Sequence, residues 1–258
     1  PHRLYGHVPA REVYSTGRWL ADVEREIGAA RAAGKLPVIV GGTGLYFKAL
    51  LKGLSPVPDI PPEVRAYWRV EAGRLGAEGL YAVLQGCDSE MAGRLAPSDV
   101  QRLTRALEVF HATGRSLARW QEQQGRAVLD ANACAMFVAE VKREELYRRL
   151  DRRFLTMIEG GALDEAAALM HLGLDVSLPA MRAIGVRPLL RHLRGDCTLA
   201  DAIAEGQGET RRYAKRQTTW LRSHMISWNA LETQQMERTK HEVNDLIRSK
   251  LDLPPHRA

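Results

Sequence analysis

The stretch of sequence that decides the fold is Leu36-Pro37-Val38-Ile39-Val40-Gly41-Gly42-Thr43-Gly44. Residues 36–40 are apolar and rich in β-branched side chains, which is typical of a strand buried on both faces of a parallel sheet. The glycine-rich turn at 41–44 follows, and the apolar residues 45–51 after it predict a helix. A strand, a glycine turn and a helix in this order form half of a βαβ unit, so we predict an α/β core.

Patterns on both sides of this stretch support an α/β core. Residues 18–33 predict a helix, because apolar residues recur there at intervals of three and four. These residues are Trp19, Val23, Ile27 and Ala30. Residues 133–141 return to a strand-like run, and from Glu144 to the end the chain is charged with helical patterns. We therefore predict that the sheet resumes near residue 133 and is followed by helices.

A proline-rich linker separates this core from a helical region. Residues 56–62 hold four prolines in seven positions, which predicts an extended segment. Beyond them, to about Gly125, the pattern is helical without a strand. Ser98 and Gln101 are placed to form a capping box at one helix start, and Gly114 to end that helix. The predicted domains are core residues 1–57, an inserted all-helical domain at 58–126, and a second, mostly helical part of the core at 127–258.

The composition is that of a globular protein. The 258 residues are 45% apolar and 26% charged, which excludes a collagen-like, low-complexity or disordered chain. No run approaches the roughly 20 apolar residues that span a bilayer. Three separated cysteines argue against a disulfide framework and indicate a reducing compartment, so we expect a cytoplasmic protein without a membrane partner. The formal net charge of +6 is modest, so the position of the cations matters more than their total.

Residues 211–222 form a strongly basic segment, with five Lys or Arg residues and no acid. At about 100° per residue, Arg211, Lys215 and Arg222 share one face of a helix, with Arg212 and Arg216 beside it. The far side carries Tyr213, Trp220 and Leu221, which we expect to face a core. The segment is typical either of a helix that binds phosphate or nucleic acid, or of a cationic helix in contact with solvent alone.

Three further segments could carry chemistry, each with a purely structural alternative. The glycines at 41–44 could let backbone amides at the start of a helix approach an anion. The structural alternative is a tight turn without a ligand. These glycines match neither the Walker motif nor the dinucleotide-binding motif. In residues 179–187, two arginines flank a stretch that could bind an anion or form a helix packed by Met181 and Ile184. The two arginines within residues 101–105 share one side of a helix and could bind a polyanion. The alternative is that they are surface residues without a ligand, since surface arginines at this spacing are common.

No spacing of ligands indicates a metal centre, because the eight histidines and three cysteines do not cluster. The acidic pairs at 144–145 and 164–165 lie in amphipathic patterns, and we interpret them as facing solvent. No G-x-S-x-G motif indicates a nucleophilic serine.

Taken together, four segments resemble the tRNA dimethylallyltransferase family, also called the tRNA isopentenyltransferases. The segments are Val40-Gly41-Gly42-Thr43-Gly44-Leu45-Tyr46 with residues 58–65 after it, then residues 99–109, 181–185 and 215–222. They occur in the family's order, and the resemblance runs from about Tyr14 to Arg222. Each motif alone is modest, but four in this order with suitable gaps are specific to the family.

The resemblance implies a P-loop-NTPase-like parallel sheet core with an inserted all-helical domain. It also implies transfer of the dimethylallyl group of dimethylallyl diphosphate to the exocyclic amine of adenine 37 in tRNA, with Mg²⁺ assisting at the diphosphate. The leaving diphosphate gains negative charge, so cations and backbone amides are needed where that charge develops. The adenine must leave its stack to react, which favours an enclosed channel with basic walls.

The resemblance also implies roles for particular residues. It places tRNA contacts at Thr43, Arg65, Gln101, Arg102, Leu103, Thr104, Arg105, Arg182, Ala183, Ile184, Gly185, Val186, Arg187, Lys215, Arg216, Gln217, Thr218, Thr219, Trp220, Leu221 and Arg222. The candidates for the diphosphate are Gly41, Gly42 and Arg182, with Arg182 preferred. It implies no metal ligand and no catalytic residue within this chain.

The sequence departs from the family pattern in two places. Val186 and Pro188 stand where the family usually carries Tyr and Gln, so a stacking or hydrogen-bonding contact is missing there. The chain also has no G-x-x-x-x-G-K-[ST] loop and no following Asp-Ser segment, whose aspartate is expected to accept the proton of the amine. The order of the segments puts both before Pro1. We therefore expect a truncated enzyme that lacks the first strand and the P-loop and cannot transfer the prenyl group alone.

Two other function classes stay open. One is a non-catalytic RNA-binding module that kept the tRNA surface of such an enzyme. The other is a P-loop-like nucleotide kinase or NTPase, against which the missing Walker motif counts. In the favoured interpretation the partners are the anticodon stem-loop of tRNA and dimethylallyl diphosphate, and we expect a monomer.

Overall fold

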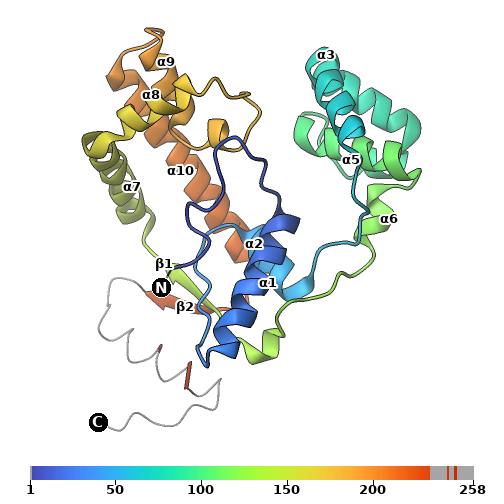
Figure 1. The fold of residues 1–258 in the computed structure, drawn as a ribbon, viewed down its shortest axis with the longest axis horizontal. Coiled ribbons are helices and arrows are strands. Elements are labelled where there is room, and N and C mark those ends of the chain that lie inside the picture. The colour runs from blue at the N-terminus through green and yellow to red at the C-terminus, as the bar shows by residue number, and fades with distance from the viewer. Residues whose placement is uncertain (1, 233–242, 244–246, 249–258) are drawn as a thin grey trace. The chain divides into compact units, whose positions relative to one another are not determined.

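The computed structural model describes residues 2–232, 243, 247 and 248, and the chain divides into two compact units (Figure 1). Unit 1 comprises residues 1–48 and 129–258, and unit 2 comprises residues 49–128. Residues 254–256, which the sequence predicts to form a disordered tail after a helix, lie outside the described residues. In the part of the chain that is described, no helix is long and apolar enough to cross a membrane.

Unit 1 is an α/β unit, as the sequence predicts. Its elements in chain order are α1 (Thr16–Ala32), the start of α2 (Gly44–Lys52), the 3-10 turn η1 (Ala131–Ala133), β1 (Phe137–Glu140), α7 (Arg143–Met157), the π-helical turn η2 (Ile158–Ala162), α8 (Leu163–His171), the 3-10 turn η3 (Ala180–Arg182), α9 (Val186–Leu193), α10 (Leu199–His224) and β2 (Asn229–Glu232). β1 pairs in parallel with β2, in a register that sets Phe137 opposite Asn229. The strand predicted within 133–141 is therefore confirmed, whereas β2 lies where helices alone are predicted.

The predicted strand at 36–40 is wrong for the described structure. These residues form no strand, and none of their backbone groups bonds to another backbone group within the described residues. Val38 and Val40 are 76% and 75% exposed. A β-strand exists only where a neighbour accepts and donates the ladder hydrogen bonds, and the described residues offer no such neighbour to this run.

The helices of unit 1 form where the apolar periodicity predicts them. The side chain of Ser15 caps α1 by accepting a hydrogen bond from the Arg18 amide, and α1 buries Trp19, Val23 and Ile27. α10 begins with a capping box in which Thr198 and Asp201 satisfy each other's backbone amides. α8, η3, α9 and the start of α10 share a core whose buried residues are Ala166, Met181, Leu189, Leu190 and Ala202.

Unit 2 contains helices alone among its elements: the end of α2, then α3 (Pro62–Cys87), α4 (Ser89–Ala92), α5 (Val100–Thr113) and α6 (Leu117–Gln121). α3 and α5 pack against each other around fully buried leucines that include Leu80, Leu84 and Leu103. Gly114 ends α5 in the left-handed conformation with φ 64°, as predicted. The predicted capping box at Ser98 is wrong, because the carboxylate of Asp99 accepts the hydrogen bond from the Arg102 amide and α5 starts one residue later.

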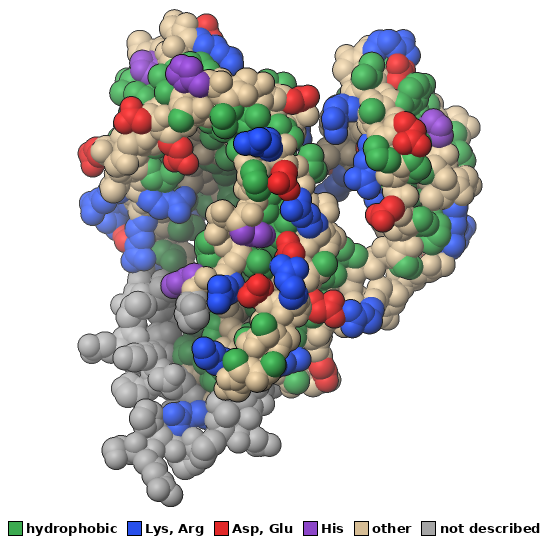
Figure 2. All heavy atoms as spheres, viewed as in Figure 1, with side chains coloured by type: hydrophobic (Ala, Val, Ile, Leu, Met, Phe, Trp, Pro, Cys, Tyr) green, Lys and Arg blue, Asp and Glu red, His purple; other side chains and the backbone are tan. Residues whose placement is uncertain are grey.

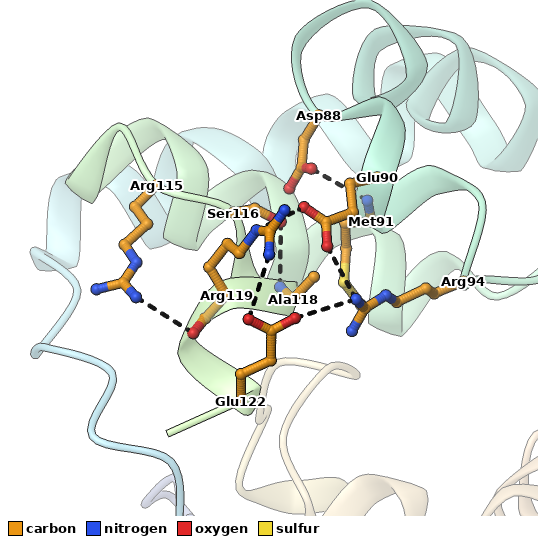
Figure 3. A network of polar contacts seen from close by, with 9 residues as sticks. All are labelled: Asp88, Glu90, Met91, Arg94, Arg115, Ser116, Ala118, Arg119 and Glu122. Atoms are coloured by element: carbon orange, nitrogen blue, oxygen red, sulfur yellow. Dashed lines mark hydrogen bonds and ion pairs between the residues drawn. The ribbon is translucent and has the colours of Figure 1, made fainter. Parts of the chain in front are cut away.

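Ion pairs link α4 to α6 on the surface of unit 2 (Figure 3). Arg94 bonds to Glu90 at 2.8 Å and to Glu122 at 3.4 Å, and Arg119 reaches Glu90 at 2.9 Å. Beneath them, Asp88 is buried and its Oδ1 accepts a hydrogen bond from the Met91 amide. The network neutralises both arginines, so neither offers a free positive charge to a ligand.

Candidate nucleic-acid interface

The C-terminal half of α10 is the basic helix that the sequence predicts. Arg212, Lys215, Arg216 and Arg222 are exposed, and none of them forms an ion pair with a carboxylate in the described part of the chain. On the face drawn in Figure 2, by contrast, Lys and Arg side chains are interspersed with Asp and Glu. Cations left without acidic neighbours on one helix give a local positive field that suits a polyanion.

Arg211 differs from the other cations of this helix. Its guanidinium bonds to the carboxylate of Asp151 on α7 at 2.5 Å, and its side chain is only 35% exposed. Gln207, one turn earlier, donates to the backbone carbonyl of Asp151 at 3.1 Å. Arg211 therefore joins α10 to α7 and is neutralised, although it lies on the helix face predicted for Lys215 and Arg222.

The glycine turn at 41–44 is held against α10. The side-chain amide of Gln217 donates to the Gly42 carbonyl at 2.9 Å. A Cβ built on Gly44 would lie 2.0 Å from the ring of Trp220, so the absence of a side chain lets the two segments touch. Thr43, between them, is exposed. The structure thus brings together two of the predicted segments, residues 40–46 and residues 215–222. Trp220 is half-buried and packs on the turn, in agreement with the prediction that it faces a core.

Aromatic residues fix the helix that follows the glycine turn. Tyr46 stacks on Trp19 of α1, with ring centroids 4.0 Å apart and an interplanar angle of 15°. Burial raises the pKa of Tyr46, and repulsion from Tyr213 raises it further. Nearby on the same unit, burial and a hydrogen bond to Asp22 raise the pKa of Tyr14 to about 12. Both shifts favour the protonated hydroxyl; that of Tyr14 donates to Asp22, and Tyr46 contributes its stacked ring.

The segment 179–187 forms a bent loop and not the predicted helix. The 3-10 turn η3 is followed by extended backbone at Ala183, and Gly185 adopts φ 91° before α9 begins. Met181 is buried as predicted, whereas Ile184 is 37% exposed. A non-glycine residue rarely adopts such a φ, so Gly185 interrupts the helical path and turns Arg182 and Arg187 outward as exposed side chains.

Phe154 and α10 hold this arginine loop in place. A Cβ on Gly185 would lie 2.9 Å from the Phe154 ring, and a Cβ on Gly206 of α10 would lie 2.2 Å from it. The carboxylate of Glu209 accepts a hydrogen bond from the Gly185 amide at 3.4 Å. Since Glu209 and Gln217 are eight residues apart on one helix, the arginine loop and the glycine turn attach about 12 Å apart along α10.

Unit 2 carries the predicted second segment at the start of α5. Gln101 and Arg102 are exposed, and Thr104 is half-buried and donates to the Val100 carbonyl. Arg102 pairs with Asp99 at 3.4 Å, and Arg105 pairs with Glu108 at 3.2 Å. Leu103 is fully buried in the core of unit 2, so its side chain is not available to RNA. The exposed neighbours, and the exposed Arg65 of α3, stay a predicted contact surface.

The remaining predicted residues take their places from the same elements. Ala183 and Ile184 are exposed in the arginine loop. Val186 begins α9 and packs half-buried against the core that includes Met181, and Pro188 of the same helix is buried. On α10, Thr218 and Leu221 are half-buried and Thr219 is exposed. Sequence reasoning missed Phe154, Gly206 and Glu209, which position the arginine loop. The sequence does contain a signal for them: Gly206 and Gly208 lie within one predicted helix, and a glycine inside a helix indicates that another element packs closely against it.

The described residues do not supply a metal centre. Among residues 2–232, 243, 247 and 248, no group of three or more His, Cys, Asp or Glu side chains lies close enough to hold an ion. Mg²⁺ favours carboxylate and phosphate oxygens in octahedral geometry, so these residues do not fit it without its diphosphate partner.

The two glycines of α10 are expected to respond to alanine with opposite signs. Gly206→Ala forces the buried Phe154 ring to move, so it should lower the free energy of unfolding by about 2 kcal/mol. Gly208→Ala meets only the end of the Arg212 side chain, 3.3 Å away, and should raise it by about 0.5 kcal/mol through helix propensity. Urea unfolding of both variants, followed by circular dichroism, measures the difference; equal shifts of one sign would contradict the packing described here.

The fold and the site define a class of protein: an α/β protein in which a glycine turn and an arginine loop are held against one basic helix. Comparison with known proteins then gives the family. The family described as IPP transferase matches residues 1–224. A curated relative from Azorhizobium caulinodans, named tRNA dimethylallyltransferase, is 51% identical over 228 residues, which cover 88% of this chain and 73% of the relative. A relative of the same name from Parvibaculum lavamentivorans is 47% identical over 96% of this chain and 78% of its own length.

Solved structures agree with this match. The full-length tRNA isopentenylpyrophosphate transferase from Bacillus halodurans is 28% identical, with a TM-score of 0.65 over 98% of this chain and 78% of that one. A eukaryotic dimethylallyltransferase crystallised in action on tRNA has a TM-score of 0.77 over 100% of this chain and 67% of its own, and at 24% identity it supports the fold alone. This chain belongs to the IPP transferase family, a family of prenyl-transferring enzymes, which confirms the family and the enzyme class predicted from the sequence.

Proposed function

We propose that this chain binds tRNA and takes part in the transfer of a dimethylallyl group from dimethylallyl diphosphate to the exocyclic amine of adenine 37. In that reaction the allylic C–O bond breaks, a C–N bond forms, the amine loses a proton and diphosphate leaves. The observation that carries the proposal is the arrangement on α10, where cations without a carboxylate partner among the described residues lie beside the docked glycine turn and arginine loop. Relatives that are 51% and 47% identical to this chain over the aligned residues bear the corresponding name.

Each part of the arrangement suits one part of the reaction. The leaving diphosphate gains negative charge, and an exposed guanidinium without an acidic partner is a strong stabiliser of that charge. Arg182 meets this condition in the described residues. A Cβ built on Gly41 would meet no atom within 4 Å, so the backbone there is open to an anion, whereas the side chain of Gln217 lies against Gly42. We assign the diphosphate to Arg182 with Gly41 and Gly42, and the tRNA backbone to Lys215, Arg216 and the residues around them, with Arg182 adding to these tRNA contacts when no diphosphate is bound.

The second candidate function is an RNA-binding module without catalysis of its own. It is favoured by one observation, which is that the exposed cations of α10 suit a polyanion whether or not a group is transferred. Both candidates require the same tRNA surface. They differ in turnover, since the module would bind tRNA without forming prenylated adenine when dimethylallyl diphosphate and Mg²⁺ are supplied.

The test is the salt dependence of tRNA binding. The variant with Arg182→Ala, Lys215→Ala and Arg216→Ala should bind an unmodified tRNA transcript at least about tenfold more weakly, with a log–log salt slope less steep by about two. A filter-binding assay at several salt concentrations measures both quantities. The slope matters because each lost phosphate contact removes a fixed share of the released counterions.

The matched control removes three cations that are already neutralised. Arg25, Arg74 and Arg148 each pair with a carboxylate three residues earlier on the same helix, namely Asp22, Glu71 and Glu145. Alanine at these three positions changes the net charge equally, and the salt slope should stay within experimental error of the parent. If both triple variants lose the same affinity, net charge and not the α10 surface determines binding, and the proposed interface is wrong.

A further inference from the structure

One face of α10 carries an open pocket whose lining extends beyond the proposed tRNA contacts. Its volume is about 570 Å³, and it is lined by the cations Arg212, Lys215 and Arg216 and by Trp220, Ser223 and His224. The lining residues recur at intervals of three and four, so they lie along one side of the helix. Three positive charges therefore surround one end of the pocket and two aromatic rings form the other.

The aromatic end is a stack with a fixed orientation. The rings of Trp220 and His224 lie 4.4 Å apart between centroids, with an interplanar angle of 1°. His224 Nδ1 lies 3.1 Å from the Trp220 carbonyl oxygen and 2.8 Å from Ser223 Oγ. A carbonyl oxygen only accepts hydrogen bonds, so Nδ1 carries a hydrogen in this contact, which fixes the orientation of the ring. Contact with Gly44 anchors the Trp220 ring from the glycine turn.

The imidazole of His224 thus extends the aromatic surface of Trp220 toward solvent. His224 is exposed, whereas Trp220 is half-buried. A flat ring whose orientation is set by packing and by its own backbone costs little side-chain entropy when it receives a ligand ring. Unpaired RNA bases stack on aromatic side chains in this manner, and the sugar–phosphate backbone beside them is held by cations.

We propose that this pocket binds one unpaired nucleotide of the RNA substrate, with its base stacked on His224 and its phosphate held by Arg212, Lys215 and Arg216. The proposal rests on the proposed function, because it deepens the contact between α10 and tRNA. It adds Arg212, Ser223 and His224 to the interface and makes the recognised feature a single-stranded base. A duplex would satisfy the cations, but its stacked bases could not reach the imidazole.

The test separates stacking from charge. The probe is a single-stranded ribonucleotide heptamer that contains 2-aminopurine, whose fluorescence falls when the base stacks. His224→Ala should weaken binding about tenfold, since stacking of one base on an aromatic side chain contributes on the order of 1–3 kcal/mol. The dependence of that affinity on salt concentration should not change in His224→Ala.

Two further variants separate the ring from the charge. His224→Phe should restore the affinity and the quenching, because a phenyl ring can stack without a titrating nitrogen. Arg212→Ala should make the salt slope less steep by about 0.7.

His171 provides a matched control for His224→Ala. It is exposed at the C-terminus of α8, and its Nδ1 lies 2.7 Å from the Ala167 carbonyl, four residues earlier, as in the His224–Trp220 contact. His171→Ala therefore removes the same local bond at a helix end outside the pocket, and RNA affinity should not change. This comparison removes the effect of a weakened helix terminus from the result.

The outcomes distinguish the two levels of the proposal. If His224→Ala binds the heptamer and tRNA as tightly as the parent while Arg212→Ala binds more weakly, the pocket holds phosphate alone and the nucleotide proposal is overturned. If the parent chain binds neither the heptamer nor tRNA, the proposed function fails together with it. Loss of binding in His171→Ala as large as in His224→Ala would also overturn the stacking role.

Discussion

Leu103→Ala is expected to lower the free energy of unfolding of unit 2 by about 3 kcal/mol. Leu103 is fully buried and packs with the leucines of α3 and with Ala106 and Leu107 of its own helix. Truncation to alanine removes apolar contacts and leaves a cavity that helices joined by short segments cannot close completely. The change lies within the predicted RNA-contacting segment, and yet its effect should be on stability.

Amide hydrogen exchange resolves this effect within a chain of two units. Protection of the α5 amides should fall by about two orders of magnitude, as a 3 kcal/mol change requires where exchange occurs through unfolding of the unit. Protection in α1 and α10 should be unchanged. Val100→Ala is the matched control, because Val100 is 39% exposed at the first position of α5 and should shift stability by less than about 0.5 kcal/mol. Equal protection in Leu103→Ala and Val100→Ala would contradict the packing of this core.

The elements that could be predicted are those whose signal is local. The helix at 18–33 and the helices after the proline-rich linker follow from apolar periodicity, and α1 and α5 lie at those positions. Gly114 ends α5 because a left-handed C-terminal residue is a local requirement that glycine meets. The helix start at Asp99 was missed by one residue, since Ser98 and Asp99 are both good caps and tertiary contacts choose between them.

The elements that could not be predicted depend on partners distant in sequence. Residues 36–40 have the composition of a buried strand, but a strand forms only in a ladder, and the described residues give this run none. β2 is the converse case: a short, unremarkable segment becomes a strand because Phe137 and its neighbours pair with it. The bend at Gly185 likewise depends on the ring of Phe154, which comes from another helix.

The sequence predicts which residue types make up the candidate site, but it does not predict which of its cations lack an acidic partner. Periodicity places Arg211 and Lys215 on one face of α10, and sequence offers no means to tell them apart. The structure pairs Arg211 with Asp151, sixty residues earlier, and leaves Lys215 without an acidic partner in the described residues. Because affinity for a polyanion depends on unneutralised cations, the contribution of each position follows from tertiary pairing.

Gly44→Ala is expected to detach the glycine turn from α10. An alanine Cβ would lie within 2.0 to 2.4 Å of three atoms of the Trp220 ring, and that ring is itself stacked on His224. Trp220 must therefore move, or the turn must lift and stretch the hydrogen bond from Gln217 to the Gly42 carbonyl. Alanine at a helix start would otherwise be favourable by up to about 1 kcal/mol. We expect a net destabilisation of unit 1 of about 2 kcal/mol, which corresponds to about 5 °C in Tm.

Gly41→Ala is the matched control for the geometry of the turn. A Cβ at Gly41 meets no atom within 4 Å, so its Tm should change by less than about 1 °C. The indole N–H signal of Trp220 in a ¹⁵N-correlated NMR spectrum should shift in Gly44→Ala and keep its position in Gly41→Ala. Binding of the 2-aminopurine heptamer should weaken in Gly44→Ala alongside that shift, since the stack on His224 depends on where Trp220 lies. A Gly44→Ala protein with the parent's Tm and an unshifted Trp220 signal would show that the turn is not docked on α10. The contact that joins residues 40–46 to residues 215–222 in the proposed site would then be wrong.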